Sequence, residues 1–411
     1  MDTSHLFTAA LRLQSPWKVG SVDFRDADGG RQELHIMIVF EPGARFPCPE
    51  TGCREDACPV HDRRGRVWRH LDFFRCKAFI HAAMPRVTCP EHGVGTVPVP
   101  WARPGGGFTL LFGAWAVEMA RHLPAGTFAG QLDETDTRLW RSVARCVDEA
   151  RRLEGYMGVE AVGIDGTGRG GRDCITVVAG LVEHDVVNVT PGRDPATVER
   201  FARGFMDHNG VPVYVRLVAC DMSLGFRKGV RGHLSHARRI VDRFHVARHA
   251  NGAVDKAGRT EGRSDPLFKR AEYLWLRNGE SLAELQVEAR RSLTGRRLRT
   301  GRACRMREVP QDVCADGRTP SEAWVRLHRL CSWVMHSRLE PMKDFARMVR
   351  RHFAGIVACF GHPYANAVLE GADGVIRNVK RRARGFRNMD HSVTMIYLTC
   401  GRLDLKAVTT T

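Results

Sequence analysis

The feature that most constrains the fold is a recurring apolar strand that ends on an acidic residue. Ala161–Asp165 (AVGID) is a run of small and β-branched residues that reaches an aspartate and then breaks into the glycine-rich GTGRGG. Val215–Asp221 (VRLVACD) and Ala237–Asp242 (ARRIVD) repeat this design. Strand ends open into loops while the sheet fixes their spacing, so acids there are well placed to handle metal ions and phosphates. We therefore predict that the aspartates of these strands belong to a functional site.

The order of the elements around these strands predicts an α/β core with a mixed sheet. Three strands in a hairpin run, at 158–165, 173–182 and 186–189, are followed by a helix at 195–206 and a strand at 213–221. A short helix then leads to another strand at 238–242. This is the order of an RNase H-like core. That fold places its first acid on the first strand and its second on the fourth, and these strands are neighbours. Asp165 and Asp221 fit those places, and Asp242 is a possible supporting acid.

A third acidic position lies far downstream on a predicted helix, Tyr364–Arg387. Residues 260–355 before it lack strand signals and are rich in arginine, which indicates an all-helical insertion that splits the core into 158–259 and 356–411. Helical spacing places Glu370 ahead of a basic face, which suits a metal beside a bound phosphate backbone. The DNA-binding candidates on this helix are Arg377, Lys380, Arg381, Arg382 and Arg384. The alternative is a surface helix with intrahelical ion pairs such as Asp373–Arg377.

The N-terminal region carries two cysteine knuckles. Cys48-Pro-Glu-Thr-Gly-Cys53 and Cys89-Pro-Glu-His92-Gly each place a proline after the first sulfur and a glycine in the turn. Two such knuckles can converge on one tetrahedral zinc, which predicts a zinc-binding ribbon over residues 48–107, after a helix and hairpin at 1–47. Unrelated buried cysteines are the alternative. A further pair follows the first knuckle, Cys58-Pro-Val-His61, and is either an alternative to these ligands or a second zinc site.

Three helical patterns follow at 108–123, 125–132 and 136–153. Short helices after a zinc knuckle in a basic protein are compatible with a helix-turn-helix reader of DNA over 108–157, although helical trios also serve as plain connectors. The chain carries 63 Lys and Arg against 46 Asp and Glu, a formal net charge of +17. Such an excess predicts a polyanionic partner, most often nucleic acid; a solubilising surface is the alternative.

The cysteine count and the terminal sequence bear on the compartment. The chain has thirteen cysteines, an odd number, and those outside the knuckle region are scattered singly. Both observations argue against a secreted disulfide framework. The first residues lack the basic start and apolar run of a signal peptide, and no apolar run reaches bilayer-spanning length. We expect a cytoplasmic protein with no membrane partner.

Taken together, the motifs resemble those of the ISL3 family of bacterial insertion-sequence transposases across nearly the full chain. The strings that carry the resemblance occur in the family's order: SPWKV, FPCPETGC, WRHLDFF, PRVTCPEHGV, VPWARPGGGFT, VGIDGTGRG, the GR-x-P loop at Gly192–Pro195, ACDMS, IVDRFHV and ANAVLEGADGVIRNVKRRARGFRN. The resemblance implies a DDE enzyme with a zinc-binding N-terminus, a helix-turn-helix region and an interrupted RNase H-like domain. It assigns the catalytic acids to Asp165, Asp221 and Glu370.

The resemblance also implies zinc ligands, cofactors and partners. The zinc ligands would be Cys48, Cys53, Cys89 and His92; the family's first knuckle is often the tighter C-x-x-C, so Cys53 departs from the pattern. Two Mg²⁺ ions, or Mn²⁺, would sit at the acids. The enzyme would bind terminal inverted repeats as a dimer or larger assembly. It would cleave the element's ends and join the 3′-hydroxyls to target DNA. It would act in a bacterial cytoplasm, at the nucleoid when bound to DNA. The rival hypotheses are a zinc-containing DNA-binding regulator that does not cut, and an RNase H-like nuclease.

Overall fold

The structure is a computed structural model that describes residues 3–27, 30–167, 174–262, 283–284, 286–288, 299–314, 319–362, 367–386 and 388–406. The chain forms two compact units. The first comprises the described residues of Met1–Glu154, Lys380–Thr399 and Leu403–Thr411, and the second those of Gly155–Val379 and Cys400–Arg402.

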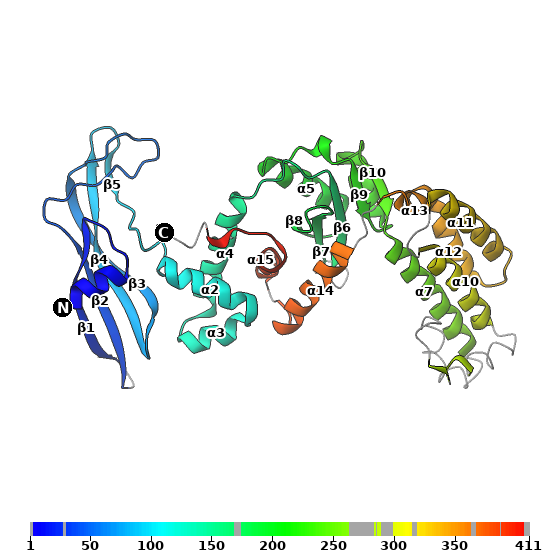
Figure 1. Ribbon diagram of the computed structural model, residues 1–411, viewed down its shortest axis with the longest axis horizontal. Coiled ribbons are helices and arrows are strands. Elements are labelled where there is room, and N and C mark those ends of the chain that lie inside the picture. The colour runs from blue at the N-terminus through cyan, green and yellow to red at the C-terminus, as the bar shows by residue number, and fades with distance from the viewer. Residues whose placement is uncertain are drawn as a thin grey trace. The chain divides into compact units, whose positions relative to one another are not determined.

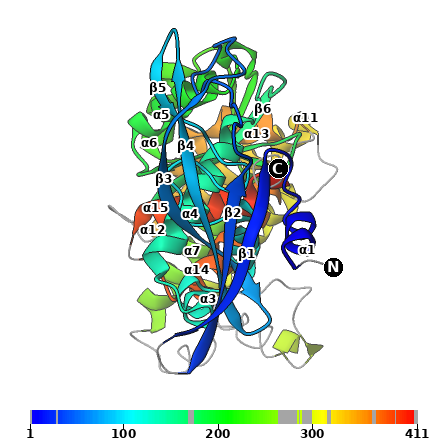
Figure 2. The ribbon, with the colours of Figure 1, turned by 90° about the vertical axis from the view of Figure 1, so that its left-hand side faces the viewer.

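A single five-stranded sheet organises the N-terminal part of the first unit. Its strands are β1 (Trp17–Ala27), β2 (Arg31–Phe40), β3 (Val60–Phe73), β4 (Cys76–Cys89) and β5 (Gly93–Thr96). The order is β1-β2-β4-β3, with β5 paired to β4, so the predicted N-terminal hairpin and the predicted ribbon strands share one sheet. Alternate residues of β2 are buried, as the period of a half-buried strand requires. Helix α1 (Thr3–Ala10) lies beside β1, and Figure 2 shows β1 between this helix and β2.

Three helices follow the sheet at the predicted places: α2 (Leu110–His122), α3 (Ala125–Leu132) and α4 (Asp136–Arg152). Thr109 caps α2, because its side-chain oxygen accepts a hydrogen bond from the Phe112 amide. The same oxygen lies 2.9 Å from Nδ1 of His70 in β3. The C-terminal helix α15 (Met389–Cys400) packs on α4, where the rings of Trp140 and His391 stack with centroids 4.1 Å apart. The predicted three-helix region is therefore a packed bundle tied to the sheet.

The second unit contains the predicted mixed sheet. Its strands are β6 (Ala161–Thr167), β7 (Ile175–Gly180), β8 (Val186–Pro191), β9 (Leu217–Cys220) and β10 (Arg238–Val241), in the order β10-β9-β6-β7-β8. The first three are antiparallel neighbours, and β9 runs parallel to both β6 and β10. The helices α5 (Pro195–Asp207) and α6 (Leu224–His233) and the short 3₁₀ turn η2 (Pro212–Tyr214) connect them. This strand order is the predicted RNase H-like arrangement, with β6 and β9 as neighbours (Figure 1).

The first acidic strand does not end where the sequence suggested. β6 continues two residues beyond Asp165, because β7 goes on pairing with it through Thr167↔Ile175. On the opposite edge the ladder to β9 stops at Ile164↔Cys220. Asp165 therefore lies within β6 but just past its last partner on β9, and Asp221 follows that same partner in sequence.

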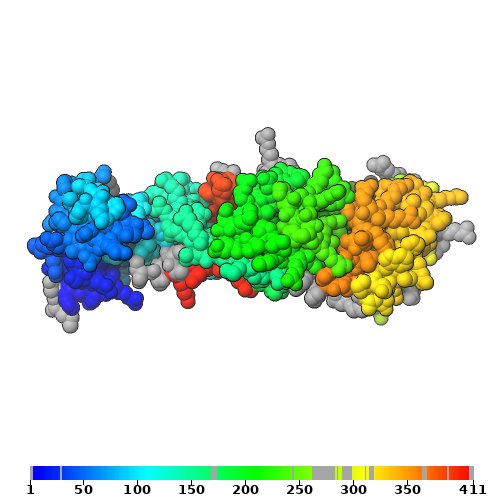
Figure 3. All heavy atoms as spheres, turned by 90° about the horizontal axis from the view of Figure 1, so that it is seen from above, coloured from blue at the N-terminus to red at the C-terminus, as the bar shows by residue number. Residues whose placement is uncertain are grey.

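The described residues of the predicted insertion, 260–355, are mainly helical. They lie in the end of α7 (Arg243–Gly262), in α10 (Arg299–Cys314), α11 (Pro320–Met335) and α12 (Glu340–Arg351), and in the start of α13 (Phe353–Cys359). A common apolar core joins α7, α10, α11 and α12, and α13 packs on β10. Figure 3 shows the yellow and orange surface of this region next to the green surface of the second unit. Most of 263–298 lies outside the described residues.

The predicted final helix is shorter than expected. It is α14 (Ala367–Arg382); positions 364–366 and 387 lie outside the described residues. The chain turns after Arg382 because Arg384 (φ 53°) and Gly385 (φ 92°) adopt left-handed conformations, and the Gly385 amide donates to the Lys380 carbonyl. Arg384 is therefore not on the helix face where helical spacing placed it.

Candidate functional site

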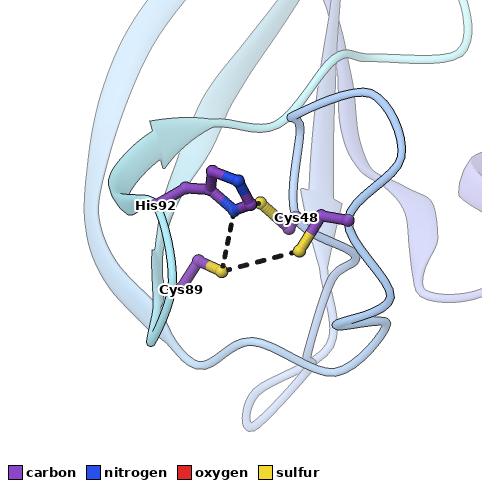
Figure 4. Close-up of side chains that lie close together, drawn as sticks. Cys48, Cys89 and His92 are labelled. Atoms are coloured by element: carbon purple, nitrogen blue, oxygen red, sulfur yellow. Dashed lines mark hydrogen bonds between the residues drawn. The ribbon is translucent and has the colours of Figure 1, made fainter.

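Four side chains of the two predicted knuckles converge at the end of the N-terminal sheet. Cys48, Cys53, Cys89 and His92 each offer an atom within 4.8 Å of the others. The Sγ atoms of Cys53 and Cys89 are 3.8 Å apart, and His92 Nδ1 lies 3.7 Å from Cys89 Sγ and 3.8 Å from Cys48 Sγ. A tetrahedral zinc with bonds of about 2.3 Å to sulfur places two sulfurs about 3.8 Å apart, so the spacing fits this metal. Figure 4 shows Cys48, Cys89 and His92 pointing toward one another.

The neighbouring thiols and His92 shift one another's pKa values within this cluster. A backbone hydrogen bond at Glu55 lowers the pKa of Cys53, but burial and the adjacent Cys48 and Cys89 thiols outweigh it and raise the pKa to about 11. Burial raises the pKa of Cys89, yet hydrogen bonds from His92 bring it down to about 6. Several thiolates held this close repel one another, and a bound zinc would stabilise them together.

The other predicted pair does not form a comparable cluster. Cys58 is buried beside the knuckles, where burial and the neighbouring Cys89 raise its thiol pKa. His61 lies on β3 with Nδ1 3.4 Å from Asp62, and its side chain is half exposed. Two groups of at least three metal-ligating side chains occur in the described part of the chain, and neither includes Cys58 or His61.

The second of these groups joins Asp165, Asp221 and His245, again with ligand atoms within 4.8 Å of one another. Asp165 Oδ1 accepts from the Gly166 amide at 2.7 Å, and Asp221 Oδ1 accepts from the Ser223 amide at 2.8 Å. These local bonds hold both carboxylates next to the last β6–β9 pair. Burial is the main cause of a raised pKa at Asp165, which His245 partly offsets.

His245 enters the site from the first turn of α7. Its Nδ1 lies 2.8 Å from Asp242 Oδ2, and its Nε2 lies 3.9 Å from Asp165 Oδ1. Asp242, predicted as a possible supporting acid, is buried directly after β10 and lies at hydrogen-bond distance from the imidazole. Sequence reasoning had not placed His245 among the site residues, although its spacing of three from Asp242 on a helix was the available signal.

Glu370 lies in the first turn of α14, and contacts on either side of it bring that turn to β6. A Cβ on Gly163 would lie 2.6 Å from Cδ1 of Leu369, so the helix packs directly on the strand. Farther along, Thr167 Oγ1 donates to Asp373 Oδ1 at 2.7 Å. The compact Asp–Asp–His group does not include Glu370. Burial raises the pKa of the Glu370 carboxyl, and the charges of Asp242 and Asp165 raise it further. Glu370 therefore interacts electrostatically with these acids.

A cation from the GR-x-P loop also reaches the acids. The Arg193 guanidinium donates to Asp221 Oδ2, and a Cβ on Gly166 would lie 3.1 Å from Arg193 Cδ. A Cβ on Gly225 would lie 2.4 Å from the Arg193 carbonyl oxygen. A residue with a side chain at position 225 would therefore prevent the loop from packing this close. The family resemblance had included the loop without giving Arg193 a role.

The structure contains the intrahelical ion pair that was the alternative interpretation of the basic residues of α14, and their DNA binding stays a prediction. Arg377 Nε donates to Asp373 Oδ2 at 2.9 Å, which is the intrahelical pair considered as the alternative. The remaining positions at the end of this segment, exposed or half-buried, are Lys380, Arg381, Arg382 and Arg384. The helix therefore combines a neutralised pair near the core with a run of basic side chains after it.

Comparison with known proteins now defines the family. The model for the DDE domain of ISL3 elements, described as "Transposase", matches residues 162–396, more than half of the chain. The chain belongs to the ISL3 family of transposases. A model described as "Helix-turn-helix domain of transposase family ISL3" matches 97–147, and one described as "zinc-finger of transposase IS204/IS1001/IS1096/IS1165" matches 44–92.

Similar transposases extend over nearly the whole of this ISL3 chain. The "Transposase for insertion sequence element IS1557" of Mycobacterium tuberculosis is 27% identical, covering 97% of this chain and 96% of the relative. The "Transposase for insertion sequence element IS1001" of Bordetella parapertussis is 22% identical, covering 87% and 89%. The matches to a zinc ribbon and a helix-turn-helix domain indicate structural zinc and DNA binding. Among the described helices, none has the length and apolar character to cross a membrane.

Proposed function

We propose that this ISL3-family protein cleaves DNA strands at the ends of its insertion sequence and joins the resulting 3′-hydroxyls to target DNA. The observation that carries the proposal is the juxtaposition of Asp165 and Asp221 on neighbouring strands, with the Glu370-bearing turn packed on the first of them. Asp165 and Asp221 lie within 4.8 Å of one another through their ligand atoms, and Glu370, from a segment far downstream, would complete the site in this proposal. Mg²⁺ is the expected metal, with Mn²⁺ as a substitute.

The donor set suits hard divalent cations. Asp165 and Asp221 supply carboxylate oxygens within 4.8 Å of one another. Burial raises the pKa of both Asp165 and Glu370, so a cation that stabilises their ionised forms would be favoured there. Two divalent cations held by these carboxylates would supply activation of a water or 3′-hydroxyl and stabilisation of the departing oxygen. Asp165 would contribute to both, while Asp221 and Glu370 would each complete one.

The other regions would deliver DNA to this site. In this proposal residues 48–107 hold one structural zinc, residues 108–157 read the terminal inverted repeats, and the insertion at 260–355 separates the core segments 158–259 and 356–411. The basic run after Arg377 would contact the phosphate backbone, which exposed arginines and lysines neutralise well. Bringing two element ends together calls for at least a dimer on DNA.

The two rival functions make different predictions about the same substrate. A non-cutting regulator would bind a terminal repeat without nicking it, and an RNase H-like nuclease would cut without joining. The test incubates the protein with a labelled terminal-repeat duplex, a target plasmid and Mg²⁺. We expect nicking at the element end and joined product. Binding without either product would overturn the enzymatic proposal, and cutting without joined product would favour the nuclease.

Matched variants connect the activity to the site. Asp221→Asn keeps the shape of the side chain but removes its charge, and should eliminate both products. Asp207→Asn makes the same change at an exposed position at the end of α5 and should leave both products intact. Equal activity of Asp221→Asn and Asp207→Asn would remove Asp221 from the proposed metal site.

A further inference from the structure

The imidazole of His245 divides its two nitrogens between two carboxylates. Nδ1 lies 2.8 Å from Asp242 Oδ2, at hydrogen-bond distance, whereas Nε2 lies 3.9 Å from Asp165 Oδ1. The first distance fits a donated N–H, and the second is too long for a direct hydrogen bond. It fits two ligands of one metal ion, because bonds of about 2.1 Å place neighbouring ligand atoms about 3 to 4 Å apart.

The local fold fixes this orientation. Asp242 is the single residue between β10 and α7, and His245 is the third residue of α7, so the start of the helix brings the two side chains together. The side chains of Asp242 and His245 are 7% and 12% exposed, so neither rotates freely into solvent. Asp221 closes the other side of the group, with its ligand atom within 4.8 Å of those of His245 and Asp165.

We propose that His245 is a nitrogen ligand of the metal shared by Asp165 and Asp221, and that Asp242 orients it from behind. The inference rests on the proposed two-metal function. A neutral imidazole that donates Nδ1–H to a carboxylate keeps the Nε2 lone pair for a metal, and the carboxylate fixes both tautomer and ring orientation. Asp242 is then a positioning residue rather than a ligand.

A nitrogen ligand changes what the site selects. Imidazole favours first-row transition ions over Mg²⁺, whereas carboxylate oxygens suit both. The site should therefore hold Mn²⁺ more tightly than Mg²⁺, and removing His245 should reduce that preference. An imidazolium that merely forms an ion pair with Asp165 would instead compete with the metal, so its removal would tighten Mn²⁺ binding.

Pulsed electron paramagnetic resonance of Mn²⁺ bound to the zinc-loaded, full-length protein tests the proposal. We expect echo modulation from a coordinated histidine nitrogen, which changes when histidine is labelled with ¹⁵N. The modulation should disappear in His245→Gln and persist in His249→Gln, one turn farther along the same helix. Asp242→Asn should retain the fold and weaken Mn²⁺ binding about 10- to 100-fold, the usual effect of losing such an orienting partner.

The outcomes separate the inference from the function on which it rests. The ligand assignment is overturned if nitrogen modulation is absent, or if it survives in His245→Gln. In either case, Mn²⁺ binding that depends on Asp221 would still uphold the metal site. Tighter Mn²⁺ binding in His245→Gln also overturns it, in favour of the ion pair. Mn²⁺ binding that is unaffected by Asp221→Asn overturns the proposed function and the inference together.

Discussion

The two candidate metal sites of this protein are built in opposite ways. The sulfur-rich site takes its ligands from two tight turns between residues 48 and 92, both at the end of one sheet. The acidic site takes its groups from positions 165, 221 and 245 and depends on the parallel pairing of β6 with β9. Its proposed fourth group, Glu370, depends on the packing of α14 on Gly163. Local turns can define one site almost alone, whereas tertiary folding must assemble the other.

The largest expected effect separates chemistry from architecture. Asp221→Asn should reduce DNA strand cleavage by about 10²- to 10³-fold or more, the range seen when one preorganised electrostatic group is removed from a reacting centre. The zinc content should remain at one per chain, because Asp221 is remote in sequence from the knuckles. Gel assays and elemental analysis measure the two quantities. Loss of zinc in this variant would show that the sites are not independent.

Cys89→Ser should have the converse effect on the metals. The structural zinc should be lost, and the N-terminal sheet should unfold at a lower temperature, because zinc binding contributes to the free energy of folding. Mn²⁺ binding at the acidic site should be retained. Cys76→Ser is the control, since Cys76 begins β4 outside the cluster. A variant that keeps stoichiometric zinc would contradict the ligand set.

Gly163→Val should test the tertiary step on which the acidic site depends. The added side chain would overlap Leu369 and Leu181, so α14 must shift, and such overpacking typically costs about 1–3 kcal/mol. We expect cleavage to fall about tenfold to a hundredfold as Glu370 moves, with zinc binding unchanged. Gly126→Val, where a Cβ meets no neighbour within 4 Å, controls for the substitution itself. Full activity in Gly163→Val would argue against a role for the Glu370 turn.

Arg193→Gln should give a smaller change, with the opposite sign for metal binding. The guanidinium donates to Asp221 and competes with a cation for the same carboxylate. A charge-assisted hydrogen bond contributes roughly 1.5–3 kcal/mol when buried, and the half-exposed Arg193 less, so Mn²⁺ should bind about three- to tenfold more tightly. Titration calorimetry measures this. Weaker Mn²⁺ binding would mean that Arg193 supports the metal site instead.

The smallest effect concerns stability without divalent ions. Burial raises the pKa of Asp165, so the stability contributed by its protonated form is present at low pH and is lost as the pH rises through that raised pKa. At neutral pH the ionised carboxylate therefore lowers the free energy of unfolding. Asp165→Asn should raise the melting temperature at neutral pH, with the difference narrowing in acid. A lower melting temperature at neutral pH would contradict this electrostatic account.

Sequence patterns predicted the local structure well and the long-range geometry only in part. The knuckles of Cys48 and Cys89, the helices α3 and α4 and the order of the core strands follow from spacing and periodicity. The extension of β6 to Thr167 does not, because it depends on the register of β7, which no local signal encodes. The end of α14 at Arg382 was also missed. Arg384 takes a left-handed conformation, which a sequence pattern indicates for glycine but not for arginine.

The acidic site shows the same division. The aspartates 165 and 221 could be placed on neighbouring strands from the element order. The spacing of His245 from Asp242 was visible in the sequence, but its approach to Asp165 depends on where the first turn of α7 points after β10. Arg193 needed the close approach that Gly225 permits. Side chains that complete a site from a neighbouring element become visible only when the tertiary contacts are known.

The most direct test of the central claim is anomalous diffraction at the manganese edge from crystals of the protein with terminal-repeat DNA and Mn²⁺. We predict two manganese peaks about 4 Å apart, one against Asp165 and Asp221 and the other against Asp165 and Glu370. Ordered DNA at the core with no manganese at these carboxylates, or with Glu370 directed away from both peaks, would contradict the account.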